Sequence, residues 1–101
     1  MSRYKMDDGT VIDTKNSIAD WDEARRWDGQ NMISVASGSQ WHHEKLRKSR
    51  KGRYYIEYES QWGNCLPRAD WISKRAAAAW LLANGHGIPD DLAAEADAVS
   101  E

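Results

Sequence analysis

A run of basic side chains in the middle of the chain is the feature best suited to chemistry. Six of the fourteen Lys and Arg residues lie within nine consecutive positions: Lys45, Arg47, Lys48, Arg50, Lys51 and Arg53. Lys and Arg neutralise nucleic-acid phosphates, and Arg also grips carboxylates and phosphates in a forked geometry. The run therefore predicts an anion-binding surface, with either an acidic protein or a nucleic acid as partner.

Aromatic residues accompany this run. The tripeptide Ser-Gln-Trp occurs on each side of it, at residues 39–41 and 60–62, and Tyr55 lies between the two copies. Trp, Tyr and Arg dominate the binding energy of protein interfaces, and aromatic rings also stack on the bases of single strands. We expect the binding residues to be Trp41, Lys45, Arg47, Arg50, Lys51, Arg53, Tyr55 and Trp62.

Acidic residues define a second candidate surface at the end of the chain. Residues 86–101 hold five acids and no Lys or Arg, although the whole chain has a net charge of only −2. Asp90, Asp91 and Glu95 lead this group and are expected to meet a basic partner, or to form a solvated helix face with acids favoured by the helix dipole. The charge distribution predicts a dipolar protein.

The residue types of catalytic and metal sites are sparse. Cys65 is the single cysteine, and no Gly-rich phosphate-binding loop is present. His42 and His43 are neighbours, so on a regular strand their side chains point to opposite faces and cannot ligate one ion. We therefore expect no enzyme activity, no metal and no cofactor.

The basic run must be positioned by the elements around it, and its pattern predicts a β-hairpin over residues 40–61. A three-residue loop, Arg50-Lys51-Gly52, places Gly52 at the left-handed position that such loops require. This register pairs Leu46 with Ile56, and likewise Lys45 with Glu57 and His43 with Glu59. Apolar and charged pairs then fall on opposite faces, as a half-buried hairpin requires. We expect Glu59 to be the carboxylate partner of His43.

The remaining elements are predicted from turn and cap signals. Asp8-Gly9 indicates a hairpin over residues 3–14, residues 32–36 and 69–72 read as strands, and Ser73 and Gly85 bound a helix over residues 74–84. Asp20 and Glu23 have the spacing of a capping box and predict a short helix over residues 20–28. A last helix begins with Pro89 at its first position. The chain is expected to fold as an α+β domain with about five antiparallel strands and two C-terminal helices on one face.

Size and composition set further bounds. A chain of 101 residues supports a single domain, residues 1–101. It has no Phe, so six Trp and four Tyr must supply much of its core. One cysteine suits a reducing compartment, and neither a secretory signal nor an apolar run long enough to span a bilayer is recognised. A cytoplasmic protein without a membrane partner is expected.

Several motifs together resemble a group of small bacterial proteins from mobile elements such as phages and plasmids. These are Ser39-Gln40-Trp41, Ser49-Arg50-Lys51-Gly52-Arg53-Tyr54, Ser60-Gln61-Trp62 and Trp80-Leu81-Leu82-Ala83-Asn84-Gly85-His86, within residues 4–92. The group has no established activity, so the resemblance implies no catalytic residue. Anti-CRISPR inhibitors are similar to this chain in general type: short, single-domain proteins that bind by surface.

The sequence leaves open a structural or self-associating domain, in which an exposed strand edge pairs two copies. It also leaves open two binding functions. The first is a non-enzymatic binding module that inhibits a host protein or nucleoprotein complex by occlusion. The alternative is a nucleic-acid-binding protein that uses the basic hairpin of residues 41–62.

Overall fold

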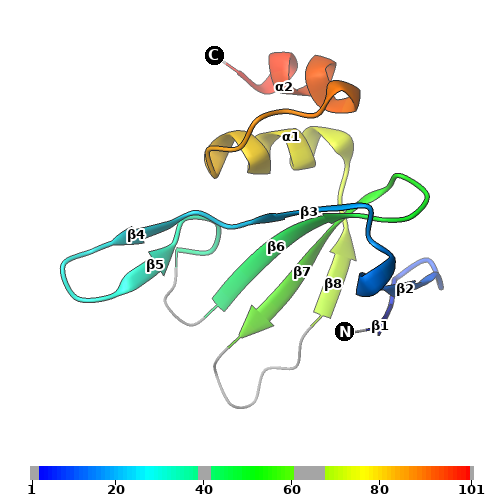
Figure 1. The fold of residues 1–101 in the computed structure, drawn as a ribbon, viewed down its shortest axis with the longest axis horizontal. Helices are drawn as coiled ribbons and strands as arrows, with labels where there is room; N and C mark the ends of the chain where they lie inside the picture. The colour runs from blue at the N-terminus through cyan, green and yellow to red at the C-terminus, as the bar shows by residue number, and fades with distance from the viewer. Residues whose placement is uncertain (1–2, 39–41, 61–67, 101) are drawn as a thin grey trace.

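A four-stranded antiparallel sheet forms the centre of the computed structural model, which describes residues 3–38, 42–60 and 68–100 (Figure 1). Its strands lie in the order β3-β6-β7-β8. Their bounds are β3 Ala19–Asp22, β6 His42–Lys48, β7 Tyr54–Ser60 and β8 Arg68–Trp71. The predicted central hairpin is β6–β7, and it provides the two inner strands of this sheet.

The register of β6 and β7 is the predicted one. Leu46 pairs with Ile56 and Lys45 with Glu57. The loop closes through hydrogen bonds between Ser49 and Arg53, and Gly52 has a φ of 88°. A β-carbon disfavours this left-handed conformation, so the glycine fixes where the turn falls and which side chains face the core.

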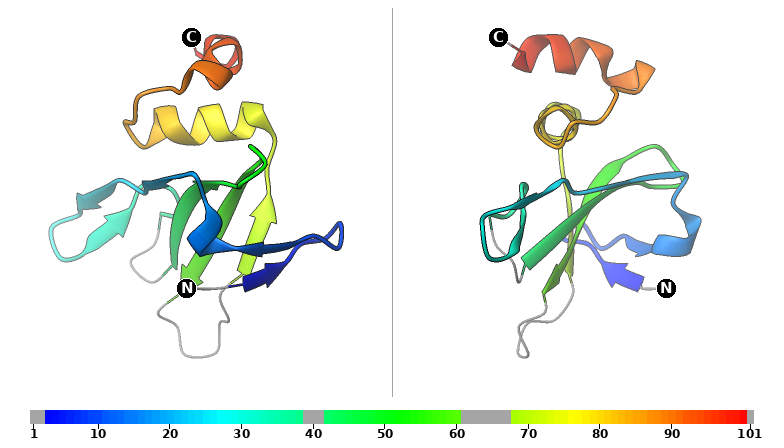
Figure 2. Two further views of the ribbon diagram at one scale, coloured as in Figure 1. Left: turned by 45° about the vertical axis from the view of Figure 1, so that its right-hand side comes forward. Right: turned by 60° about the vertical axis from the view of Figure 1, so that its left-hand side comes forward.

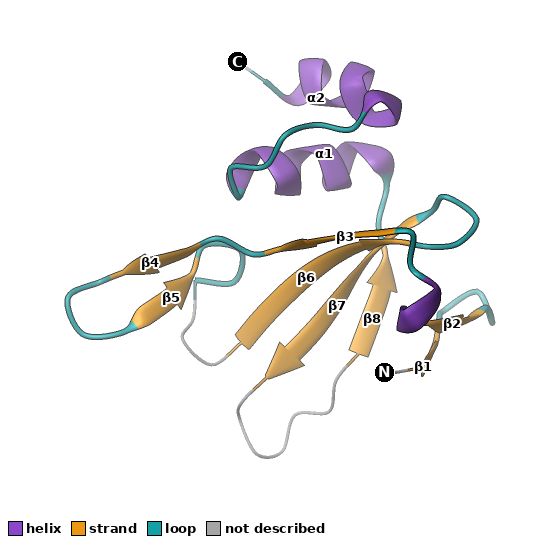
Figure 3. Ribbon diagram, viewed as in Figure 1, coloured by secondary structure: helices purple, strands orange, loops and turns teal. Residues whose placement is uncertain are grey.

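Two helical layers cover one face of the sheet, as Figure 3 shows. Helix α1 (Lys74–Ala83) begins at the predicted cap, because the Ser73 hydroxyl accepts a hydrogen bond from the Ala76 N–H. A 3-10 turn, η2 (Asp90–Leu92), then leads into α2 (Ala93–Val99), so Pro89 precedes a 3-10 turn and does not open an α-helix. The core between these layers and the sheet contains Leu46, Tyr54, Ile56, Ala77, Trp80, Leu81 and Leu92.

The N-terminal hairpin packs against the opposite face. Strands β1 (Arg3–Lys5) and β2 (Val11–Asp13) pair across the predicted turn at Gly9, and the 3-10 turn η1 (Thr14–Asn16) follows. Their buried side chains form a second cluster, made of Met6, Ile12, Tyr55 and Ala69. The sheet is therefore covered on both faces, and its aromatic residues are divided between two cores.

The predicted helix over residues 20–28 is wrong. That segment contributes β3, which pairs with β6, and β4 (Arg25–Trp27), which pairs with β5 (Met32–Ser34) in a separate hairpin. Figure 2 shows this hairpin from two further sides. Gly29 therefore does not end a helix. It lies in the turn of this hairpin with a φ of 104°. The described residues thus contain eight strands in three sheets, more than the five expected, within the predicted α+β class.

Candidate binding surfaces

Most charges of the basic hairpin are paired within the protein. Each of the following bases lies close to a carboxylate: Lys45 to Asp22 at 3.1 Å, Arg47 to Glu57 at 2.9 Å, Lys48 to Asp91 at 3.0 Å and Arg53 to Asp8 at 2.9 Å. Three of these bases, Lys45, Arg47 and Arg53, are predicted binding residues, and every pair except Arg47–Glu57 connects the hairpin to surrounding elements. The charge that looks concentrated in the sequence is largely neutralised in space.

Arg50 and Lys51 are different. Both are exposed in the loop between β6 and β7, and neither has an ion-pair or hydrogen-bond partner in the part of the chain that the structure describes. An exposed cation is solvated by water, so the lack of an ion-pair partner costs the fold little free energy. Of the predicted basic set, these two side chains are the ones available to a ligand.

The predicted aromatic anchors do not form a described surface. The prediction that Tyr55 anchors a partner is wrong. Tyr55 is 1% exposed and its hydroxyl lies 2.7 Å from the Ser17 hydroxyl, so its side chain belongs to the core. Its ring meets Trp71 edge to face. Burial raises the pKa of Tyr55, as expected for a phenol in the interior. Trp41 and Trp62 lie outside the described residues.

The three residues of the predicted acidic surface also differ in their surroundings. Asp91 is held from two sides, because Lys48 lies 3.0 Å away and the Tyr54 hydroxyl donates to both of its carboxylate oxygens. Burial alone would raise the pKa of Asp91, but the hydrogen bonds from Lys48 and Tyr54 hold it below its ordinary value. Asp90 is exposed and Glu95 is half-buried. Asp91 thus tethers η2 to the central hairpin, which the sequence pattern did not indicate.

The β4–β5 hairpin is a surface that the sequence analysis missed. We call residues 25–34 the arm; it projects beyond the β3 edge of the central sheet, away from the β6–β7 turn (Figure 1). Trp27 and Met32 pair directly across it and are 63% and 48% exposed. Directly paired residues lie on the same face of a two-stranded ribbon, so these two form one apolar patch. Arg25 and Arg26 are exposed beside it.

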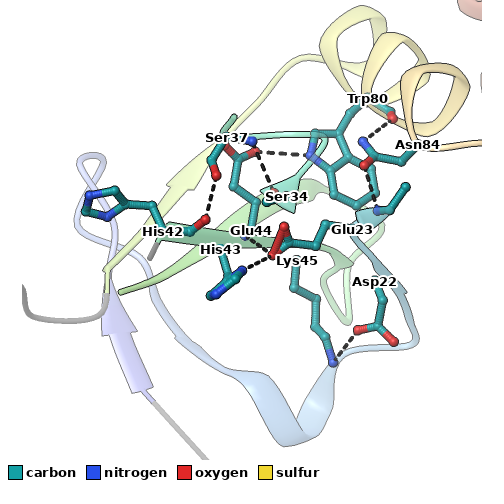
Figure 4. Close-up of polar contacts among 11 residues, drawn as sticks. Asp22, Glu23, Ser34, Ser37, His42, His43, Glu44, Lys45, Trp80 and Asn84 are labelled. Atoms are coloured by element: carbon teal, nitrogen blue, oxygen red, sulfur yellow. Dashed lines mark hydrogen bonds and ion pairs between the residues drawn. The ribbon is translucent and has the colours of Figure 1, made fainter. Parts of the chain in front are cut away.

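Polar contacts fix the base of the arm, and Figure 4 draws the part of them that involves Asn84. The Ala24 N–H donates to the Asn84 side chain at 2.8 Å, and the Ala24 carbonyl accepts from the Val35 N–H at 2.8 Å. The His86 ring donates to the Asp22 carbonyl at 2.6 Å. The segment that follows α1 therefore holds the N-terminal end of the arm, and the Ala24–Val35 hydrogen bond joins that end to the other.

Glu23 adds a further contact there. Its Oε1 accepts from His43 Nδ1 at 2.8 Å and from the Glu44 N–H at 3.1 Å, while Oε2 is buried without a hydrogen-bond partner (Figure 4). The expected His43–Glu59 ion pair is therefore wrong, although these residues do pair in register. Both residues of the His43–Glu23 pair line a charged cleft of about 760 Å³.

A carboxylate that accepts a hydrogen bond from one histidine nitrogen fixes the proton on that nitrogen. Glu23 has this relation to Nδ1 of His43. The described residues place no nucleophilic side chain in hydrogen-bonding contact with His43. Within the same ranges, no group of three or more His, Cys, Asp or Glu side chains is arranged to hold a metal ion. The geometry therefore supports a structural role for the pair.

Comparison with known proteins identifies no relative. No family model matches the chain, and no curated protein or solved structure does either. Neither of the described α-helices is long and apolar enough to cross a membrane. Function is therefore inferred from the arrangement of side chains described above.

Proposed function

We propose that the protein is a non-enzymatic binding module that inhibits a host protein or nucleoprotein complex by occlusion, with the arm as its contact surface. The exposed Trp27–Met32 pair carries this proposal. Trp, Met and Arg are enriched at protein interfaces, and a Trp that fills a pocket on its partner is a typical hot spot. The resemblance to mobile-element proteins favours a defence effector in the host cytoplasm as the target.

The fixed base of the arm supports this choice. A backbone segment that is already held in its bound position loses little conformational entropy on association, so more of the contact energy appears as affinity. Contacts from Ala24 to Asn84 and Val35 supply this restraint at both ends of the arm. The partner surface that fits is apolar at its centre, with carboxylates placed to meet Arg25 and Arg26.

The basic hairpin is a weaker candidate for the main protein contact. Lys45, Arg47, Lys48 and Arg53 already have carboxylate partners, and Tyr55 is inaccessible. A partner that recruited these bases would first have to break their existing ion pairs. The arm requires no such rearrangement.

The test is an affinity capture from bacterial lysate, with and without nuclease, followed by a binding measurement on the captured protein. We expect a nuclease-resistant partner whose binding weakens at least tenfold in Trp27→Ala, because truncating a hot-spot residue costs about 2 kcal/mol or more. The matched control is Ile18→Ala, which removes an apolar side chain of similar exposure, 60%, outside the arm.

Equal loss of binding in the two variants contradicts the arm as the contact surface. Capture that disappears entirely with nuclease contradicts protein recognition itself. Circular dichroism of each variant separates loss of contact from loss of fold, and both variants are expected to retain the wild-type spectrum because both side chains are exposed.

A further inference from the structure

A second cleft lies where the N-terminal hairpin meets the β6–β7 turn. It has a volume of about 530 Å³, within the range of ligand sites, and Arg3, Arg50, Lys51 and Arg53 all line it. Asp13 is the one acidic residue among the described residues that line the cleft. This concentration of positive charge is separate from the arm and has no role in the function proposed above.

The cleft is built by a defined set of contacts. Asp8, in the turn of the N-terminal hairpin, accepts hydrogen bonds from Arg53 at 2.9 Å and from the Trp71 indole at 3.3 Å. The Arg53 guanidinium lies over the Trp71 ring, 3.8 Å from its centre. These contacts hold two hairpins that are distant in sequence against one another, so the walls of the cleft are set before any ligand arrives.

The cations at its edge are available. Arg50 and Lys51 have no ion-pair partner in the described ranges, and the Arg3–Asp13 pair is long, at 3.4 Å, with Arg3 76% exposed. An exposed pair of this kind contributes little stability, so an incoming anion displaces it readily. The Ser49–Gly52 and Ser49–Arg53 hydrogen bonds hold the loop that presents Arg50 and Lys51.

We propose that this cleft binds the phosphate backbone of a nucleic acid. Exposed cations bind a single small anion weakly, because water and salt screen each pair. A polyanion gains from the same cations, because each neutralised phosphate releases condensed counterions. The charge of the cleft therefore fits a chain of phosphates better than an isolated anion.

The contact is to the backbone and not to the bases. Two aromatic residues, Tyr55 and the half-buried Trp71, line the cleft and meet edge to face. The Arg53 guanidinium lies over the Trp71 ring. Arg53 therefore occupies a ring face on which a base would stack, and we expect binding that does not depend on sequence. The nucleic acid of a nucleoprotein target is one source of such a backbone.

The test measures binding of a fluorescent twelve-nucleotide thymidine strand at several salt concentrations. We expect Arg50→Ala/Lys51→Ala to weaken binding about tenfold or more at low salt, and to lower the salt slope by about two. The control, Lys74→Ala/Arg75→Ala, removes the same charge from two exposed residues of α1, on the other side of the sheet, and is expected to bind as the wild type does.

Three results overturn the proposal: no binding by the wild type at low salt, equal loss in both double variants, or displacement of the strand by a twelve-residue glutamate peptide at equal concentration. The last result identifies an acidic-protein site instead. Trp27→Ala is expected to bind the strand normally, so failure of the arm as a protein contact and failure of this cleft are separate outcomes.

Discussion

The Glu23 carboxylate lies 2.8 Å from His43 Nδ1 and, through the same oxygen, accepts the Glu44 N–H. The contact joins the segment between β3 and β4 to the start of β6. Glu23 precedes Ala24, which is at the base of the arm. The Glu23 side chain is 4% exposed and the His43 side chain is 13% exposed. A buried carboxylate with two donors is therefore part of what holds the arm to the body.

We predict that Glu23→Ala destabilises the protein by about 1–3 kcal/mol, because it leaves two partly buried donors without an acceptor. Glu23→Gln keeps an acceptor oxygen at this position and is expected to lose less. Urea unfolding measures both changes. Glu59→Ala is the control, since Glu59 is exposed, and should lie within about 0.5 kcal/mol of the wild type.

A second prediction concerns pH. Hydrogen bonds from Thr10 and Arg53 hold the pKa of Asp8 well below its ordinary value of 3.8. A lowered folded-state pKa stabilises the fold above the unfolded-state value, and this contribution is lost as the pH falls toward the folded-state value. We expect Asp8→Asn to be less stable than the wild type at neutral pH, and the difference to shrink below about pH 4.

Urea midpoints of both proteins at neutral pH and in steps below pH 4 test this. A difference that stays constant across that range contradicts the assignment to Asp8. Asp7→Asn is the matched control, because Asp7 is exposed in the same turn and has no side-chain partner among the described residues. It should follow the wild type at each pH.

The central hairpin could be predicted because its signals are local and agree with one another. Gly52 fixes the turn, and the turn fixes the Leu46–Ile56 pairing and the division of the two faces. The start of α1 is equally local, because Ser73 caps it through the Ala76 N–H. No information from distant segments is needed for these features.

The local signals over the arm conflict with one another. Asp20 and Glu23 have capping-box spacing, but Asp20 lies opposite Arg47 in β6 and Glu23 binds His43. Pairing with β6 and the anchoring by Asn84 are long-range and override the local helix signal. Two sequence features did point to strands: the alternation of half-buried Ala19 and Trp21 with exposed Asp20, and Asp28-Gly29 as a hairpin turn.

For the basic hairpin, the backbone could be predicted and the side-chain contacts could not. Its register followed from sequence, but the partners of its side chains did not. Asp8, Asp22 and Asp91 come from three separate elements, and nothing in the linear sequence relates them to Arg53, Lys45 and Lys48. The sequence therefore located the charge run, and the fold determines which of its charges are paired with carboxylates.

A third prediction tests the turn of the central hairpin. Gly52→Ala places a β-carbon on a residue with a φ of 88°, and the expected cost is about 1–2 kcal/mol. The nearest atom to that β-carbon would be Lys48 Cε at 3.9 Å, so the cost comes from the backbone and not from a clash. Gly87→Ala, at an exposed glycine without positive φ, is the control. Thermal unfolding should separate the two variants; equal midpoints contradict the account.

The last prediction concerns the tether between the central hairpin and η2. The Tyr54 hydroxyl is buried beneath Asp91, and burial together with that carboxylate raises the pKa of Tyr54, so the phenol stays a donor. Tyr54→Phe is expected to cost about 1 kcal/mol. Tyr58→Phe is the control, because the half-buried Tyr58 makes no hydrogen bond through its hydroxyl to the described residues.

A double-mutant cycle of Tyr54→Phe with Asp91→Ala isolates the bond itself. Since Asp91 also binds Lys48, the single Asp91→Ala variant should lose more than Tyr54→Phe, and the two losses should not add. The expected coupling is at least about 0.5 kcal/mol. Additive losses would mean that the Tyr54 hydroxyl acts independently of Asp91, because Tyr54→Phe keeps the ring that packs against Trp21 and lies beneath Lys48.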